Sequence, residues 1–176
     1  MSKLNALIAG STGYIGIQLI KLLVKHKYID IKYLCGNSSV GKKVSYYDKT
    51  LSIKKLPKII KFNKNLLKDI DVIFTALPNG EAQDIANQLN KNIVLIDLAA
   101  EFRLEKSKDY LKWYKKKHKA IKLIKKSLYS LPEINGNELN KYQIMGYLSW
   151  SCSVFRGVWV LATGECPHTT TNFMKN

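Results

Sequence analysis

Three glycines at three-residue spacing follow the first apolar segment of the chain, residues 4–9. Gly10, Gly13 and Gly16 separate this strand-like run from an amphipathic helical pattern at residues 17–23. Such glycines let a backbone approach a pyrophosphate, and the free N–H groups at the helix start favour anionic oxygens. The spacing is a variant of the commoner G-x-G-x-x-G, and a glycine-rich turn without a ligand is the alternative. The candidate phosphate-binding residues are Gly10, Ser11, Thr12, Gly13, Tyr14, Ile15 and Gly16.

Length and cysteine content limit the classes of protein that the chain can represent. Its 176 residues suit one domain, or one and a fraction, with a substantial core. The sequence has no run of about twenty apolar residues and no signal-peptide hydrophobic region at its start, so we expect a soluble cytoplasmic protein without a membrane partner. Cys35, Cys152 and Cys166 are too widely spaced for a metal site or a disulfide framework, and any cysteine chemistry would be that of a thiol.

The formal net charge of +16 raises the question of a nucleic-acid partner. The excess is nearly all lysine spread along the chain, and Arg103 and Arg156 are the two arginines. Recognition of bases and phosphates favours arginine forks with interleaved aromatic residues, which this sequence lacks. We therefore expect a solvated lysine surface and no nucleic-acid partner.

Strand-like and helix-like segments alternate along the chain as far as residue 146. The apolar runs at 71–77 and 92–97 are nearly continuous, as is typical of parallel strands covered on both faces. This order predicts an α/β fold with a doubly wound parallel sheet, a Rossmann-type NAD(P)-binding domain over residues 1–146. The predicted strands are residues 4–9, 29–35, 71–77, 92–97 and 142–145, with candidate short strands at 52–56 and 58–62, and helices are predicted from 13 to about 25 and from 80 to about 89.

A lysine-rich helical pattern covers residues 106–126. We expect Tyr110, Trp113 and Tyr114 to form its packing face rather than a base-stacking platform. His26 and His118 fall on segments with a surface-like helical pattern, where neither suggests a site.

The composition changes after Gly146. From residue 147 onward there is no isoleucine and one lysine, while tryptophan, cysteine and threonine are concentrated. Residues 147–176 are thus either a divergent segment or the product of a shifted reading frame or truncated gene, and we favour the second explanation.

The loop after the second predicted strand bears on the choice of cofactor. An acidic residue there would bind a ribose 2′-hydroxyl and select NAD. This loop instead holds Asn37, Ser38 and Ser39, with Lys42 and Lys43 just beyond. Small donors and nearby cations suit a 2′-phosphate, which predicts NADP(H), whereas a solvated turn without a ligand is the alternative.

Two further loops follow buried strands, where ligands of a doubly wound sheet lie. Leu77, Pro78 and Asn79 lie beside the expected path of the nicotinamide, although Pro-Asn-Gly is also a common turn. Residues 97–103 hold two carboxylates and the first arginine. As an alternative to contacting a ligand, these residues would have a structural role, in which the carboxylates cap the next helix and the arginine pairs with one of them.

Four segments carry a family resemblance in this order. They are Gly10-Ser11-Thr12-Gly13-Tyr14-Ile15-Gly16, residues 76–80 (A-L-P-N-G against A-L-P-H-G), residues 94–103 (V-L-I-D-L-A-A-E-F-R against V-I-D-L-S-A-D-F-R) and residues 129–133 (Y-S-L-P-E against Y-G-L-P-E). Together they resemble the N-acetyl-gamma-glutamyl-phosphate reductases of the semialdehyde dehydrogenase family, over roughly residues 4–146.

The resemblance implies NADPH-dependent reduction of a small-molecule acyl phosphate to an aldehyde in arginine biosynthesis, by a cysteine thiolate with a proton-handling histidine, and possible homo-oligomers of full-length members. The family pattern N-P-G-C-Y would follow Gly146, where this chain has Trp150 and then Cys152. Cys152 is therefore the candidate nucleophile in an unusual context, and we expect this chain to bind cofactor without turnover. A stand-alone NADP-binding module and a reductase of aminoadipate or aspartate acyl phosphates are the alternatives.

Overall fold

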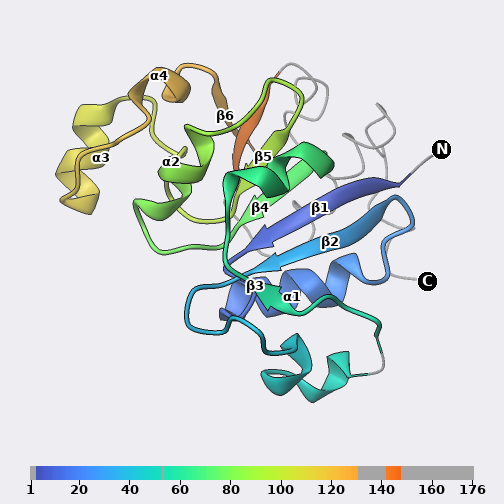
Figure 1. Cartoon of the computed structure of the whole chain (residues 1–176). Helices are drawn as coiled ribbons and strands as arrows, with labels where there is room; N and C mark the ends of the chain where they lie inside the picture. Colours follow the sequence, from blue (N-terminus) through green and yellow to red (C-terminus); the bar gives the residue numbers. More distant parts are fainter. Residues whose placement is uncertain (1–2, 53, 131–141, 148–176) are drawn as a thin grey trace, which may run out of the picture.

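The structure is a computed structural model that describes residues 3–52, 54–130 and 142–147. Its centre is a sheet of seven strands in the order β3-β2-β1-β4-β5-β7-β6, and every neighbouring pair is parallel (Figure 1). The predicted α/β doubly wound fold is thereby confirmed. The strands are β1 (Leu4–Ala9), β2 (Ile29–Cys35), β3 (Ile59–Ile60), β4 (Val72–Thr75), β5 (Val94–Asp97), β6 (Ser127–Ser130) and β7 (Ile144–Tyr147).

Helices cover both faces of this sheet. Figure 1 shows α1 on one side and α2 on the other, while α3 lies farther out than α2 and α4 leads into β6 at the edge of the sheet. Every helix in the described ranges is too short or too polar to cross a membrane. The helices are α1 (Tyr14–Leu23), α2 (Glu81–Ala86), α3 (Ser107–Tyr114) and α4 (Ile121–Ile124), and the 3₁₀ turns are η1 (Val44–Tyr46), η2 (Lys49–Leu51) and η3 (Lys64–Asp69).

The core is divided between the two faces by the alternation of side chains along each strand. In β1, Ala6 and Ile8 pack in one cluster with the apolar side of α1. Leu7 and Ala9 pack in the other cluster, which includes residues of η3 and α2. A strand buried on both faces must be apolar at every position, which explains the continuous runs in the sequence.

The chain reverses its winding direction between β1 and β4. β2 pairs with β1 on one side and β4 pairs with it on the other. In open α/β sheets, ligands bind outside the carboxyl ends of the strands at this point. The glycine loop after β1 and the loops after β2 and β4 therefore share one edge of the sheet.

The strands predicted at 4–9 and 29–35 have these same bounds in the structure, and those predicted at 71–77, 92–97 and 142–145 are present with shifted ends. The segment 58–62 contains the two-residue β3, but the described residues of 52–56 form no strand, and that prediction was wrong there. β6 was missed because its sequence, S-L-Y-S, is polar at both ends. The tail predicted at residues 147–176 lies outside the described residues, apart from the backbone of Tyr147 at the end of β7.

The lysine-rich pattern at 106–126 is two helices rather than one. They are separated after α3 by Lys115, which has a left-handed φ of 55°. Tyr110 is buried and its ring lies 4.9 Å from that of Tyr114, as expected for positions four residues apart on a helix. Trp113 is 71% exposed, so its predicted packing role was wrong, since α3 covers only the Tyr110 side.

Both histidines predicted on surface segments are buried, so this expectation was also wrong. His26 Nδ1 accepts a hydrogen bond from the N–H of Tyr28, and His118 Nδ1 accepts one from Ala120. Each imidazole thus accepts a hydrogen bond from the backbone N–H of the residue two positions later in the chain. A lysine-rich neighbourhood in the sequence conceals this local contact.

Candidate functional site

The glycine loop begins where β1 ends against β4. Gly10 has a φ of +87°, and a Cβ there would lie 2.2 Å from the carbonyl oxygen of Ala76. A Cβ on Gly16 would lie 2.2 Å from the Gly10 oxygen. Both positions therefore require glycine for close backbone packing, and the first turn of α1 is drawn against the end of β1.

Gly13 differs from its two neighbours because the fold leaves room at this position. It is the N-cap of α1, and a Cβ there would have the Gly10 oxygen as its nearest neighbour at 3.5 Å, an ordinary contact. The N–H groups of Ile15 and Gly16 have no protein acceptor within the described residues. A glycine facing open space beside such donors leaves a cradle that a side chain would fill, and this geometry fits a phosphate.

The glycine loop is tied to the end of β2. The carbonyl oxygen of Cys35 accepts hydrogen bonds from the N–H groups of Gly10 and Ser11, at 3.0 and 3.1 Å, and from the Ser11 hydroxyl at 3.0 Å. Ser11 is fully buried, so its side chain supports the loop rather than facing a ligand. Tyr14 is 68% exposed at the start of α1.

The loop after β2 lies directly beside the glycine loop. Ser39 is buried, and its hydroxyl donates to Thr12 Oγ1 at 3.4 Å and accepts from Tyr47 at 2.8 Å. Asn37 and Ser38 are exposed next to it. Of the three residues predicted to meet a ribose phosphate, Ser39 holds the two loops together, and Asn37 and Ser38 remain open to a ligand.

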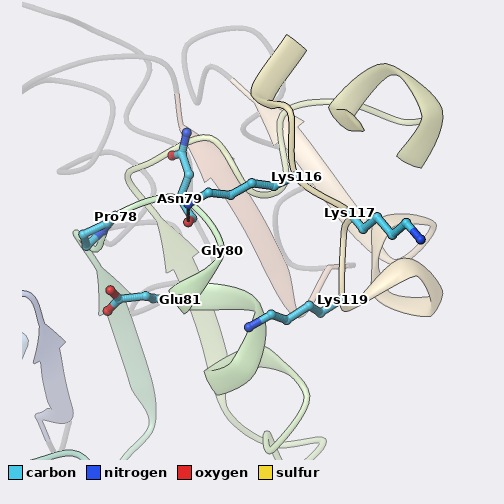
Figure 2. A pocket seen from close by; sticks show the side chains of 7 residues that line it. All are labelled: Pro78, Asn79, Gly80, Glu81, Lys116, Lys117 and Lys119. Carbon is cyan, nitrogen blue, oxygen red and sulfur yellow. Dashed lines mark hydrogen bonds between the residues drawn. The ribbon is translucent and has the colours of Figure 1, made fainter. Parts of the chain in front are cut away.

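The turn after β4 lines a pocket on the same edge of the sheet. Leu77 adjoins the glycine loop, because its Cδ2 lies 3.4 Å from the position of a Cβ on Gly10. Pro78 is exposed, and Lys116 Nζ donates to the carbonyl oxygen of Asn79 at 2.9 Å. Figure 2 shows the Lys116 side chain extending toward Asn79. The pocket has a volume of about 470 Å³ and is lined by Pro78, Asn79, Gly80, Glu81, Lys116, Lys117 and Lys119.

Two buried carboxylates stand behind this turn. Asp97 accepts from the Thr75 hydroxyl at 2.9 Å and from the N–H groups of Ala99 and Glu101 at 3.2 and 2.9 Å. Burial raises the pKa of Asp97 to about 6, although these hydrogen bonds favour its ionised form. Neither carboxylate caps the next helix, which begins only at Ser107, so that structural alternative is wrong.

Glu101 is the centre of a buried polar cluster. Its side chain accepts from the N–H of Gly80 at 2.6 Å, from Tyr110 at 2.8 Å and from the amide of Gln83. Burial, followed by the hydrogen bond to Glu101, raises the pKa of Tyr110, which keeps the phenol a donor. The sequence did not identify this cluster, because Gln83 and Tyr110 come from separate helices and carry no motif.

His118 completes the cluster through the backbone. Its Nδ1 accepts from Ala120, so Nε2 carries the proton that is donated to the carbonyl oxygen of Glu101 at 2.9 Å. Burial lowers the pKa of His118 and favours this neutral form. Arg103 pairs with neither carboxylate in the described part of the chain, and its Nε has no partner there.

The thiol that the structure describes is unsuited to nucleophilic chemistry. Cys35 is buried at the end of β2, and burial raises the pKa of its thiol to about 12. Cys152, the candidate nucleophile, lies outside the described residues. The described residues also contain no group of three or more side chains suited to bind a metal ion.

Together, the sheet order and the glycine loop define a Rossmann-type nucleotide-binding domain. A family model described as "Semialdehyde dehydrogenase, NAD binding domain" matches residues 5–142. The chain belongs to this family.

Curated relatives carry a more specific name. N-acetyl-gamma-glutamyl-phosphate reductase of Brachyspira hyodysenteriae is 40% identical over 147 residues, covering 79% of this chain and 42% of the relative. The reductase of the same name from Clostridium beijerinckii is 36% identical over 139 residues, covering 78% of this chain and 40% of the relative. The chain thus spans about two fifths of the length of these relatives.

Solved structures support the fold. Aspartate semialdehyde dehydrogenase II of Vibrio cholerae has a TM-score of 0.54 at 17% identity, covering 92% of this chain and 42% of that one. The enzyme of Candida albicans, solved with NADP, has a TM-score of 0.51 at 21% identity, covering 92% and 46%. At this identity the likeness concerns the arrangement of strands and helices alone.

Proposed function

We propose that the carboxyl edge of the sheet binds NADP(H). The observation that carries this proposal is the room at Gly13 beside the N–H groups of Ile15 and Gly16. A pyrophosphate there would accept hydrogen bonds from the first turn of α1, whose ten residues also favour a negative charge at that end. Ser11 and Cys35 keep the loop in shape without occupying this space.

The 2′-phosphate of the cofactor would bind at the loop after β2. Asn37 and Ser38 are exposed there, and residues 36–43 contain no carboxylate. Lys42 lies on the same loop, with its Nζ 4.9 Å from the ring centroid of Tyr46. A phosphate dianion gains charge-assisted hydrogen bonds from such groups, whereas a bare hydroxyl does not.

The nicotinamide half would extend past the turn formed by Leu77, Pro78 and Asn79. This turn adjoins the glycine loop through Leu77 and opens on the pocket of about 470 Å³. The bound cofactor would supply the hydride. The residues of this chain would bind its phosphates, orient its ring and limit the positions that the ring can take.

The reaction that we propose for the whole protein is the reduction of N-acetyl-gamma-glutamyl phosphate to its semialdehyde, the activity in the name of the relatives. The support is the identity of 36–40% to those reductases over most of this chain. This chain would contribute the cofactor-binding part, with a small acyl phosphate as the partner molecule. A cofactor-binding module without catalysis is the second candidate, favoured by the sequence after Gly146, which lacks the family pattern N-P-G-C-Y.

Calorimetric titration with NADPH and NADH tests the proposal. We expect NADPH to bind more tightly by about 1–3 kcal/mol, because the 2′-phosphate adds charge-assisted contacts. Equal affinities would remove the argument for NADP, and no binding of either nucleotide would overturn the assignment of the site.

A further inference from the structure

The far end of the turn after β4 is held by two side chains from later in the chain, one on each side of α3. Glu101 accepts the N–H of Gly80 at 2.6 Å, and Lys116 donates to the oxygen of Asn79 at 2.9 Å. At its near end the turn continues from β4, where the N–H of Ala76 donates to the carbonyl oxygen of Ala9 at 2.9 Å. Its position relative to the phosphate cradle therefore depends on residues that do not line that cradle.

The carboxylate that holds Gly80 is itself rigidly placed. Glu101 is fully buried, its own N–H donates to Asp97, and its second oxygen accepts from Tyr110 and Gln83. A buried carboxylate needs such donors, because an unpaired charge in the interior is strongly destabilising. These hydrogen bonds hold the Glu101 side chain in one orientation, in which one carboxylate oxygen faces Gly80.

Gly80 needs this support. Its φ is +100°, which lies in the left-handed region, and no side chain caps the short helix α2 that follows it. The hydrogen bond from Gly80 to Glu101 selects one orientation of the peptide between Asn79 and Gly80. Lys116 donates to the carbonyl oxygen of this same peptide.

We propose that Glu101 is a positioning residue for the nicotinamide half of the cofactor, with Lys116 as a second, weaker support. Glu101 is fully buried and acts through the Pro78-Asn79-Gly80 turn, and Lys116 supports the same turn through the Asn79 carbonyl group. This inference rests on the proposed function, since it requires a dinucleotide at the carboxyl edge. It assigns the buried cluster a role in ligand geometry as well as in stability.

The test compares NADPH with 2′,5′-ADP, which carries the adenosine half alone. Because 2′,5′-ADP would not reach the turn, a positioning role predicts selective loss of NADPH affinity. In Glu101→Gln we expect the Kd of NADPH to rise about tenfold or more and the Kd of 2′,5′-ADP to change less than about twofold. A general loss of structure would weaken both ligands equally.

Lys116→Met provides a second variant that leaves the core intact, because Lys116 is exposed. We expect the Kd of NADPH to rise about threefold, again without a change for 2′,5′-ADP. Lys122→Met, an exposed lysine of α4 with the same charge change, is the matched control and should alter neither Kd. If Glu101→Gln does not fold, Lys116→Met decides the question.

The possible outcomes separate this inference from the proposed function. Equal changes for both ligands, or no change in either variant, would overturn the positioning role while cofactor binding stands. Wild-type protein that binds 2′,5′-ADP as tightly as NADPH would also overturn it, because the nicotinamide half would then make no contribution. Wild-type protein that binds neither ligand would overturn the proposed function and this inference with it.

Discussion

Thr75 and Asp97 join the ends of β4 and β5 through a hydrogen bond of 2.9 Å between two fully buried side chains. The Thr75 hydroxyl donates to Oδ1, and backbone N–H groups supply the other donors to Asp97. A buried carboxyl group thus links the ends of two neighbouring strands at the carboxyl edge of the sheet, and burial raises its pKa.

The pH dependence of stability follows from this carboxylate. The pKa of Asp97 is about 6 in the folded chain, above its ordinary value of 3.8, so the folded state holds the proton more tightly. The contribution of Asp97 to the free energy of unfolding should therefore fall as the pH rises from about 4 to about 6, by roughly 1–3 kcal/mol.

Urea denaturation of wild type and Asp97→Asn at several pH values measures this slope. We expect the free energy of unfolding to fall less steeply between pH 4 and 6 in the variant, because the amide does not titrate. Because the pKa of His118 is lowered, its contribution to the free energy of unfolding rises with pH, opposite to that of Asp97. His118 is common to both proteins, so this contribution cancels in the difference. Identical slopes would show that Asp97 titrates normally.

The glycines of the loop should separate into two kinds on mutation. Gly13→Val should fold, because a Cβ at this position meets only the Gly10 oxygen at an ordinary contact distance of 3.5 Å, but it should weaken NADPH binding tenfold or more by blocking the phosphate. Gly16→Ala should instead lower the melting temperature, since its Cβ would lie 2.2 Å from the Gly10 oxygen. Thermal unfolding and NADPH titration of both variants make the comparison. Normal NADPH affinity in a folded Gly13→Val would mean that the cradle lies elsewhere.

Cofactor preference should be reversible at one exposed position. Ser38→Asp places a carboxylate where the 2′-phosphate would bind, which repels NADPH and offers NADH an acceptor for its ribose hydroxyl. We expect the ratio of the NADH and NADPH dissociation constants to fall tenfold or more. Ser38→Ala controls for loss of the hydroxyl. A ratio that is the same in all three proteins would place the 2′-phosphate away from this loop.

Catalysis should be absent in the purified chain. The Cys35 thiol is buried and remains protonated at neutral pH, and Cys152 follows Trp150 where the family pattern has a glycine turn. We expect no NADPH-dependent reduction of N-acetyl-gamma-glutamyl phosphate and no phosphate-dependent oxidation of the semialdehyde in reverse. Turnover that survives Cys35→Ser and is lost in Cys152→Ser would contradict this expectation.

The sequence predicted those features that depend on local pattern. The continuous apolar runs indicated the inner strands, and the glycine spacing indicated the strand-turn-helix unit, because both are set by neighbours in the chain. The roles of individual side chains were less accessible. Ser39 was expected to face a ligand but bonds to Thr12 and Tyr47, residues of two other segments.

The Glu101 cluster shows why the rest could not be predicted. Its partners come from three parts of the chain: Gly80 and Gln83 from the start of α2, Tyr110 from α3 and His118 from the loop before α4. The donors to the buried carboxylate come from Gln83 of α2 and Tyr110 of α3, so the cluster forms only when these helices come together in the fold. The sequence singled out the segment that carries Glu101, but it did not show which side chains would surround this carboxylate.

The Cys35 carbonyl, with its three donors from Gly10 and Ser11, fixes the glycine loop before any ligand arrives. Ordering a flexible loop on binding would oppose association through lost conformational entropy, at about 1–2 kcal/mol for each backbone residue. Here the hydrogen bonds to the Cys35 carbonyl oxygen, at the end of β2, have already ordered the glycine loop during folding. Preorganisation of this kind lets contacts at the helix start contribute to affinity with little entropic opposition.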